Sequence, residues 1–117
     1  MPWVNAIFVK EVSRGEQDQI KSEIARILKD ILGKEEQGLS VTFFKTDGFF
    51  RAGEACSDAA VVEVQYIGQF PLVKKQEITR CICELLERLL KLAPLKVIVL
   101  FSEFPSEKWG RKAGDFQ

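Results

Sequence analysis

Apolar residues recur with a helical spacing in two separate stretches of this chain. Ile or Leu occupies six positions at steps of 0, 4, 7, 8, 11 and 12, beginning at Ile20. The same steps, again with Ile or Leu at every position, begin at Ile78. Such steps place the apolar side chains on one face of an amphipathic helix. They predict helices over residues 17–32 and 73–92, related by an offset of 58 residues.

Short segments with alternating apolar positions flank both predicted helices, and the same offset relates them. Alternation at a period of two is typical of strands. It predicts strands over residues 3–8 and 39–45 in the first half, and over 60–67 and 95–102 in the second. The matched apolar positions are Val4, Ala6 and Phe8 with Val62, Val64 and Tyr66, then Leu39, Val41 and Phe43 with Val97, Val99 and Phe101. We therefore expect one domain over 1–117, built from a repeat of 1–57 and 58–117.

The predicted order, strand–helix–strand twice, defines an α+β two-layer sandwich with two possible topologies. In one, each half is a parallel βαβ unit, and the two pseudo-symmetric units form a four-stranded sheet. In the other, the chain is ferredoxin-like, with an antiparallel sheet. Residues 95–101 are apolar on both strand faces, which favours the first topology. Two helices cover only one face of such a sheet, so we expect an oligomer, the alternative being a loop across the second face.

Composition narrows the possible functions. The 117 residues are 46% hydrophobic and 29% charged, with 17 basic and 17 acidic side chains. This balance argues against a nucleic-acid partner, because proteins that bind nucleic acids carry a surplus of basic residues. No apolar run approaches the ~20 residues of a membrane helix, and the N-terminal residues do not resemble a signal peptide. We expect a cytoplasmic protein with no membrane partner.

The chain contains no histidine, which excludes Ser-His-Asp and Cys-His catalysis and His-ligated zinc. A catalytic base must therefore be another group. Cys81 and Cys83 would point roughly 200° apart on a helix, since a turn takes ~3.6 residues. We expect these thiols and Cys56 to be reduced and to bind no metal.

Three passages resemble the tautomerase superfamily, in particular macrophage migration inhibitory factor and 4-oxalocrotonate tautomerase. Pro2 follows the initiator methionine at the start of a strand. Residues 52–68 combine a Gly-containing loop, an acidic residue, a strand and Ile67-Gly68. Residues 96–114 combine a last strand, Glu-x-Pro, an acidic residue, Trp109-Gly110 and a further Gly114. The resemblance implies two βαβ units per subunit, a homotrimer, and keto–enol tautomerisation of a small enol or 2-oxo acid without metal or cofactor.

The resemblance also implies a role for Pro2 as the catalytic base. Removal of Met1 would leave a secondary amine with a lone pair. An α-amino group titrates near pH ~8, and burial beside apolar residues lowers that pKa toward neutrality. Such an amine suits general acid–base catalysis. If Met1 remains, the nitrogen is an amide without basicity.

Four further positions match residues of the family's site. Lys34 corresponds to a lysine near the substrate mouth, although a lysine after a helix is also an ordinary C-terminal charge. Ile67 occupies the position that supplies a backbone amide, or it is a core residue at the strand end. Trp109 is either a pocket wall or a subunit contact. Arg14 corresponds loosely to an arginine that holds a substrate carboxylate, or it is solvated.

The chain departs from the family pattern on its last strand. Ile98 and Leu100 stand where migration inhibitory factor has a Tyr and an Asn, and neither side chain donates a hydrogen bond. The resemblance therefore leaves two alternatives to a tautomerase: a non-catalytic trimeric interaction protein, and a dehalogenase or decarboxylase of the same superfamily.

Overall fold

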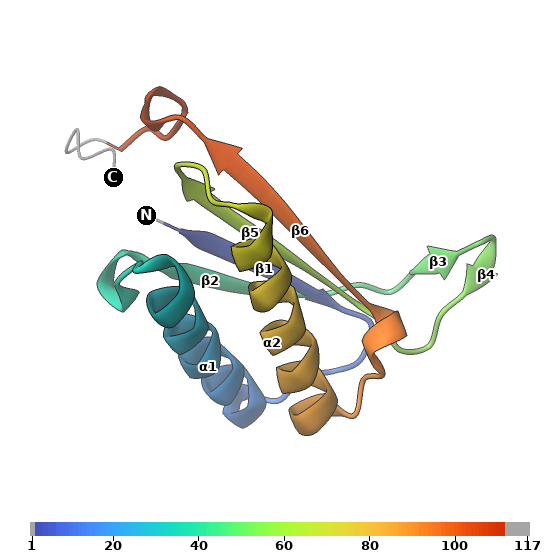
Figure 1. Cartoon of the computed structure of the whole chain (residues 1–117). Helices are drawn as coiled ribbons and strands as arrows, with labels where there is room; N and C mark the ends of the chain where they lie inside the picture. The colour runs from blue at the N-terminus through green and yellow to red at the C-terminus, as the bar shows by residue number, and fades with distance from the viewer. Residues whose placement is uncertain (1, 112–117) are drawn as a thin grey trace.

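A computed structural model describes residues 2–111; Met1 and residues 112–117, which include Gly114, lie outside the described part. Figure 1 shows the helices packed on a sheet. The elements in chain order are β1 (Trp3–Phe8), α1 (Arg14–Leu32), η1 (Glu36–Gly38), β2 (Ser40–Lys45), β3 (Phe50–Arg51), β4 (Glu54–Ala55), β5 (Ala60–Ile67), α2 (Leu72–Leu90), η2 (Pro94–Lys96), β6 (Val97–Phe104) and η3 (Ser106–Lys108), where η denotes a 3₁₀ turn.

The main sheet has the strand order β2-β1-β5-β6. β1 pairs with β2 in parallel and β5 pairs with β6 in parallel, while β1 and β5 pair antiparallel at the centre. Each half is thus a complete βαβ unit whose two strands are direct neighbours. The ferredoxin-like alternative is wrong, because its βαβ units are split by an intervening strand.

The two βαβ units are pseudo-symmetric down to the residue register. An offset of 58 maps both ends of α1 onto α2 and both ends of η1 onto η2. It also maps the β1–β2 partners Val4 and Val41 onto the β5–β6 partners Val62 and Val99. The α+β architecture with two such units is therefore confirmed.

The helix ends differ from the prediction for local reasons. α1 begins three residues early because Ser13 and Glu16 form a capping box, in which each side chain accepts a hydrogen bond from the other residue's backbone N–H. Gly33 ends α1 in the left-handed conformation, with φ 71°. Lys91, its repeat equivalent, ends α2 in the same conformation with φ 61°. Pro94 begins η2, and β6 follows from Val97, two residues later than predicted.

The helices cover one face of the sheet, and the core fills the space between these two layers (Figure 1). Along β1 and β5, every second side chain points to that face and is buried. No segment of the described residues 2–111 covers the outer face, where Ile98 and Leu100 are 40% and 47% exposed. Residues 95–101 were predicted to be buried on both faces. In the single chain the inner-face residues Val97, Val99 and Phe101 are only partly buried against the core, and the outer-face residues are exposed.

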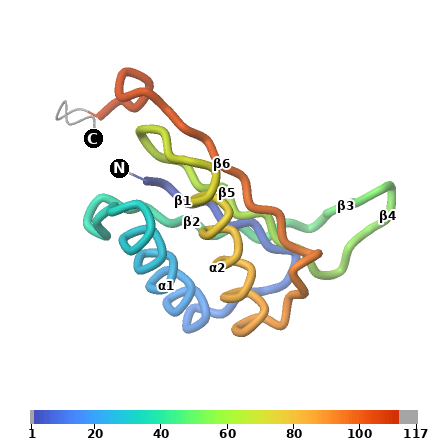
Figure 2. The backbone as a smooth tube through the Cα atoms, viewed as in Figure 1, coloured from blue at the N-terminus to red at the C-terminus, as the bar shows by residue number. Residues whose placement is uncertain are grey.

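The segment between the two units forms the short hairpin β3–β4. Ala52 and Gly53 make its turn, with φ 52° and 82°. Figure 2 shows the hairpin projecting from one end of the sheet, away from both helices. Phe50 at its base is 71% exposed. Among the helices of the described chain, none is long and apolar enough to cross a membrane.

Candidate active site

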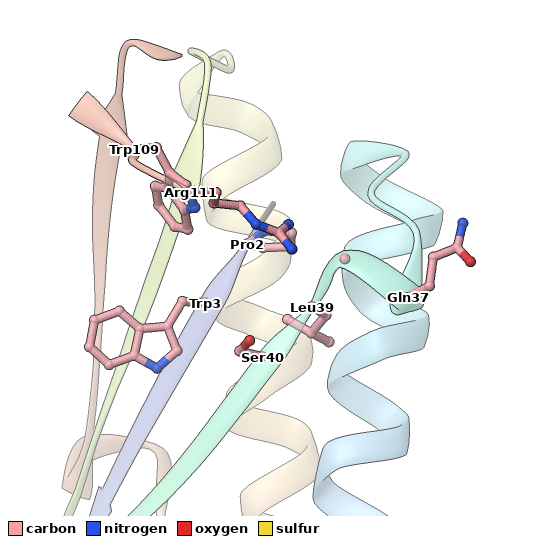
Figure 3. Close-up of a pocket in the computed structure, with 8 residues that line it drawn as sticks. Pro2, Trp3, Gln37, Leu39, Ser40, Trp109 and Arg111 are labelled. Atoms are coloured by element: carbon pink, nitrogen blue, oxygen red, sulfur yellow. The ribbon is translucent and has the colours of Figure 1, made fainter. Parts of the chain in front are cut away.

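An open cavity of about 490 Å³ lies at the end of the sheet where β1 begins. Its walls come from three places: the start of β1, the η1–β2 connection, and the segment after η3 (Figure 3). The lining residues are Pro2, Trp3, Gln37, Gly38, Leu39, Ser40, Trp109 and Arg111. Segments far apart in sequence therefore meet around Pro2.

Pro2 is buried, and its position is held by strand pairing. The backbone N–H of Ser40 donates to the Pro2 carbonyl oxygen at 3.1 Å, which extends the β1–β2 ladder by one residue. Only the Pro2 carbonyl group takes part in this bond, and the residue lines the cavity. The sheet thus presents residue 2 in a defined place, which a frayed terminus would not do.

Trp3, the next lining residue, is fixed by a chain of hydrogen bonds across the uncovered sheet face. Its indole Nε1–H donates to Thr42 Oγ1 at 3.0 Å, and the Thr42 hydroxyl donates to Asn5 Oδ1 at 2.7 Å. The Asn5 amide then donates to Glu63 Oε1 at 2.9 Å. This chain links β2, β1 and β5 and holds one cavity wall in a single orientation.

Trp109 closes the cavity from the C-terminal side. η3 turns the chain back after β6, and the Trp109 backbone N–H donates to the Ser106 carbonyl oxygen at 3.1 Å. The indole packs edge-on against Phe104, with ring centroids 5.6 Å apart. Of the two roles considered for Trp109, the wall of the Pro2 cavity is thus the one seen within the single chain.

Lys34 and Ile67 lie together, but neither lines the cavity within the described chain. The Lys34 ammonium donates to the Ile67 carbonyl oxygen at 3.1 Å and stands 5.8 Å from the centroid of the Phe70 ring. The Ile67 group engaged here is its carbonyl, whereas the resemblance pointed to its amide. Lys34 is half-buried and ties the end of α1 to the end of β5.

Arg14 stands apart from these residues. It is the first residue of α1, which follows the C-terminal end of β1, whereas Pro2 precedes the N-terminal end. Its side chain is 87% exposed and lies 3.6 Å from the Asp18 carboxylate. Within one subunit, Arg14 and Pro2 are therefore at opposite ends of the strand. Ile98 and Leu100 likewise do not line the cavity and point to the uncovered sheet face.

A partly buried polar cluster braces the sheet end near Lys34. One carboxylate oxygen of Glu103 accepts hydrogen bonds from the Tyr66 hydroxyl at 2.7 Å and the Phe70 backbone N–H at 3.0 Å. The Lys75 ammonium lies 3.2 Å from the same oxygen. The Tyr66 hydrogen bond is the main cause that lowers the pKa of Glu103. Burial of Tyr66, together with that bond, raises the tyrosine pKa.

Of the eight lining residues, only Pro2 and Trp109 were predicted from the sequence as site residues. The polar side chains that were missed are Gln37, Ser40 and Arg111. Gln37 and Ser40 lie in a turn and at a strand start, where polar residues are ordinary. Arg111 lies in the C-terminal motif, two residues after Trp109. Its nearness to Trp109 in the sequence could have indicated it as a site residue. No cluster of His, Cys, Asp or Glu suited to a metal ion occurs within residues 2–111.

Comparison with known proteins gives matches by structure alone. No protein-family model matches the chain, and no curated protein sequence does. A macrophage migration inhibitory factor homologue from Prochlorococcus marinus has 20% identity and a TM-score of 0.85, with 98% of this chain and 99% of that one covered.

Two further structures of the same architecture match at the same TM-score. Pt0534, solved after inactivation by 2-oxo-3-pentynoate, has 14% identity, a TM-score of 0.85, and coverage of 96% and 93%. The Q0 fused 4-OT wild-type symmetric trimer has 14% identity, a TM-score of 0.85, and coverage of 97% and 94%. The chain therefore has the tautomerase-superfamily fold, that of macrophage migration inhibitory factor and 4-oxalocrotonate tautomerase.

Proposed function

We propose that this chain is a cofactor-independent tautomerase that interconverts the enol and keto forms of a small 2-oxo acid. Pro2 is its general base once Met1 has been removed. The observation that supports this most strongly is the placement of buried Pro2 at the wall of an open cavity. The fold of the chain adds support, since its structural neighbours include a 4-OT.

The proposed step moves one proton and needs no oxidant or reductant. The Pro2 nitrogen takes a proton from the carbon beside the carbonyl group. The C–H electrons form the C=C bond, the carbonyl π electrons move to oxygen, and that oxygen takes up a proton. Enol-to-keto conversion is the reverse. Trp3 and Trp109 form apolar walls beside the base, and Gln37 and Ser40 offer hydrogen-bonding groups to the substrate oxygen.

A homotrimer is part of the proposal. The uncovered sheet face carries the apolar side chains of Ile98, Leu100 and Phe44, each at least 40% exposed. Phe44 and Ile98 lie at opposite edges of the sheet, and the strand register places the apolar residues Ile7 and Val61 in the row between them. An exposed apolar row of this kind marks an interface. A second copy of the chain is its proposed occupant, and a monomer in sedimentation equilibrium at micromolar concentration would contradict this. The proposed setting is the cytoplasm, with no nucleic acid or membrane partner.

The tautomerase proposal is tested with protein shown by intact mass to lack Met1. Loss of the ultraviolet absorbance of a 2-oxo acid enol reports ketonisation directly. We expect catalysed conversion above the buffer rate, and no conversion by matched protein that retains Met1, because its Pro2 nitrogen is an amide. Equal rates for both forms would contradict Pro2 as base.

Ile98 and Leu100 favour the second candidate, a non-catalytic trimer. These side chains replace polar groups of migration inhibitory factor, so the chain lacks two hydrogen-bond donors of that factor's site. Absence of any conversion by Met1-free protein across several enols, together with a trimer in sedimentation, would favour this candidate.

A further inference from the structure

We infer that Arg111 is the residue that holds the substrate carboxylate, and that the cavity selects small 2-oxo monoacids over neutral ketones. The inference deepens the proposed function and rests on it for the identity of the site. Lys34 and Arg14, the cations that the sequence suggested, do not line the cavity within the chain, whereas Arg111 does.

Arg111 determines the charge of the cavity. It is the one charged side chain among the lining residues in the described part of the chain. The other polar side chains there, Gln37 and Ser40, are neutral. Arg111 is exposed, so its guanidinium group is the positive charge that an anion meets on approaching this open, otherwise neutral cavity.

Arg111 also makes no ion pair within residues 2–111. In contrast, Arg14, Arg26 and Arg80 each lie close to a carboxylate on their own helix. Within residues 2–111 its guanidinium group therefore has no carboxylate partner, and the planar group matches a carboxylate in a bidentate geometry.

The local fold directs Arg111 to Pro2. Trp109 packs on Phe104, which places the next residues over the start of β1. Figure 3 shows the Arg111 side chain extending from this segment toward Pro2. A 2-oxo acid bound with its carboxylate on Arg111 would bring the adjacent carbonyl and its α-carbon toward Pro2. A neutral ketone would lack this attachment.

The two tryptophans of the chain both line the cavity, so binding is measurable without turnover. Protein labelled with ¹⁵N is titrated with 2-oxobutanoate and, separately, with butanone, while the two indole N–H signals are followed. We expect 2-oxobutanoate to shift these signals with saturation, and butanone to bind at least tenfold more weakly. Arg111→Gln weakens 2-oxobutanoate binding about 10- to 100-fold, the effect of losing a charge-assisted hydrogen-bond pair. Arg111→Lys gives an intermediate loss.

Lys108→Gln is the matched control. Lys108 lies three residues before Arg111, and its replacement also removes one positive charge, but its side chain does not line the cavity. It leaves binding unchanged. Equal binding of acid and ketone, no binding of the acid at millimolar concentration, or equal losses in the two Gln variants would each overturn the inference. Saturable binding that depends on Arg111 in a protein without turnover would instead refute only the proposed function.

Discussion

Replacing Pro2 by Ala lowers kcat/KM for 2-oxo acid tautomerisation by about 100-fold or more. General acid–base catalysis by a positioned group contributes about 10²–10⁴-fold. Alanine keeps an α-amino group, but a primary amine on a freely rotating residue is poorly oriented and better hydrated. The pyrrolidine ring, in contrast, is held by the Ser40 to Pro2 backbone hydrogen bond and by burial. The measurement is steady-state ketonisation by Met1-free preparations of both proteins.

Pro94→Ala is the matched control for this substitution. Pro94 is an exposed residue of η2 and does not line the cavity. Its replacement leaves kcat/KM within twofold of the parent value. A Pro2→Ala protein that retains more than a third of the parent activity would exclude the proline nitrogen as the principal base.

Replacing Glu103 by Ala destabilises the fold by about 2–4 kcal/mol. The substitution removes a charged acceptor from the Tyr66 hydroxyl, which is fully buried, and from the Phe70 backbone N–H. Hydrogen bonds to charged groups contribute about 1.5–3 kcal/mol each, and a buried donor left without a partner carries a penalty of similar size. Urea unfolding at one protein concentration measures the change.

The lowered pKa of Glu103 also predicts that the stability of the fold depends on pH. Its hydrogen bonds lower its pKa in the folded state, so the ionised form stabilises the fold at any pH above the unfolded value of ~4.3. This contribution is lost as the pH falls through the lowered folded-state pKa. Glu103→Gln removes that part of the acid sensitivity, whereas Glu107→Ala, an exposed residue of η3, changes stability by less than ~0.5 kcal/mol. Equal effects of the Ala substitutions at 103 and 107 would contradict the bracing role.

Most of the fold was predictable from the sequence because the two halves repeat each other. The period-two segments around Val4 and Val62 and the helical faces of α1 and α2 placed every long element within three residues of its ends. The remaining differences depend on backbone geometry that apolar periodicity does not record. Lys91 ends α2 in a left-handed conformation that a lysine rarely adopts. A lysine at this position therefore does not predict the end of a helix.

The site was less predictable, since its walls depend on tertiary contacts. Pro2 and Trp109 were identified through the resemblance, and they line one cavity. Lys34 was chosen by its position in the chain, but its ammonium is engaged with the Ile67 carbonyl oxygen. Arg111 reaches the cavity only because η3 and the Trp109–Phe104 contact turn the chain back. No local pattern of polar residues predicts that the chain turns back toward Pro2 after η3.

Covalent labelling tests whether Pro2 presents a free, reactive amine to this cavity. The alkyne of 2-oxo-3-pentynoate accepts a nucleophilic amine at its β-carbon, and the neighbouring carbon takes up the proton. Met1-free protein is incubated with this acid, and peptide mass mapping locates the adduct. We expect one adduct per chain, on Pro2, formed with saturation and absent from Pro2→Ala. Unmodified Pro2, or labelling confined to Cys56, Cys81 and Cys83, would contradict this expectation.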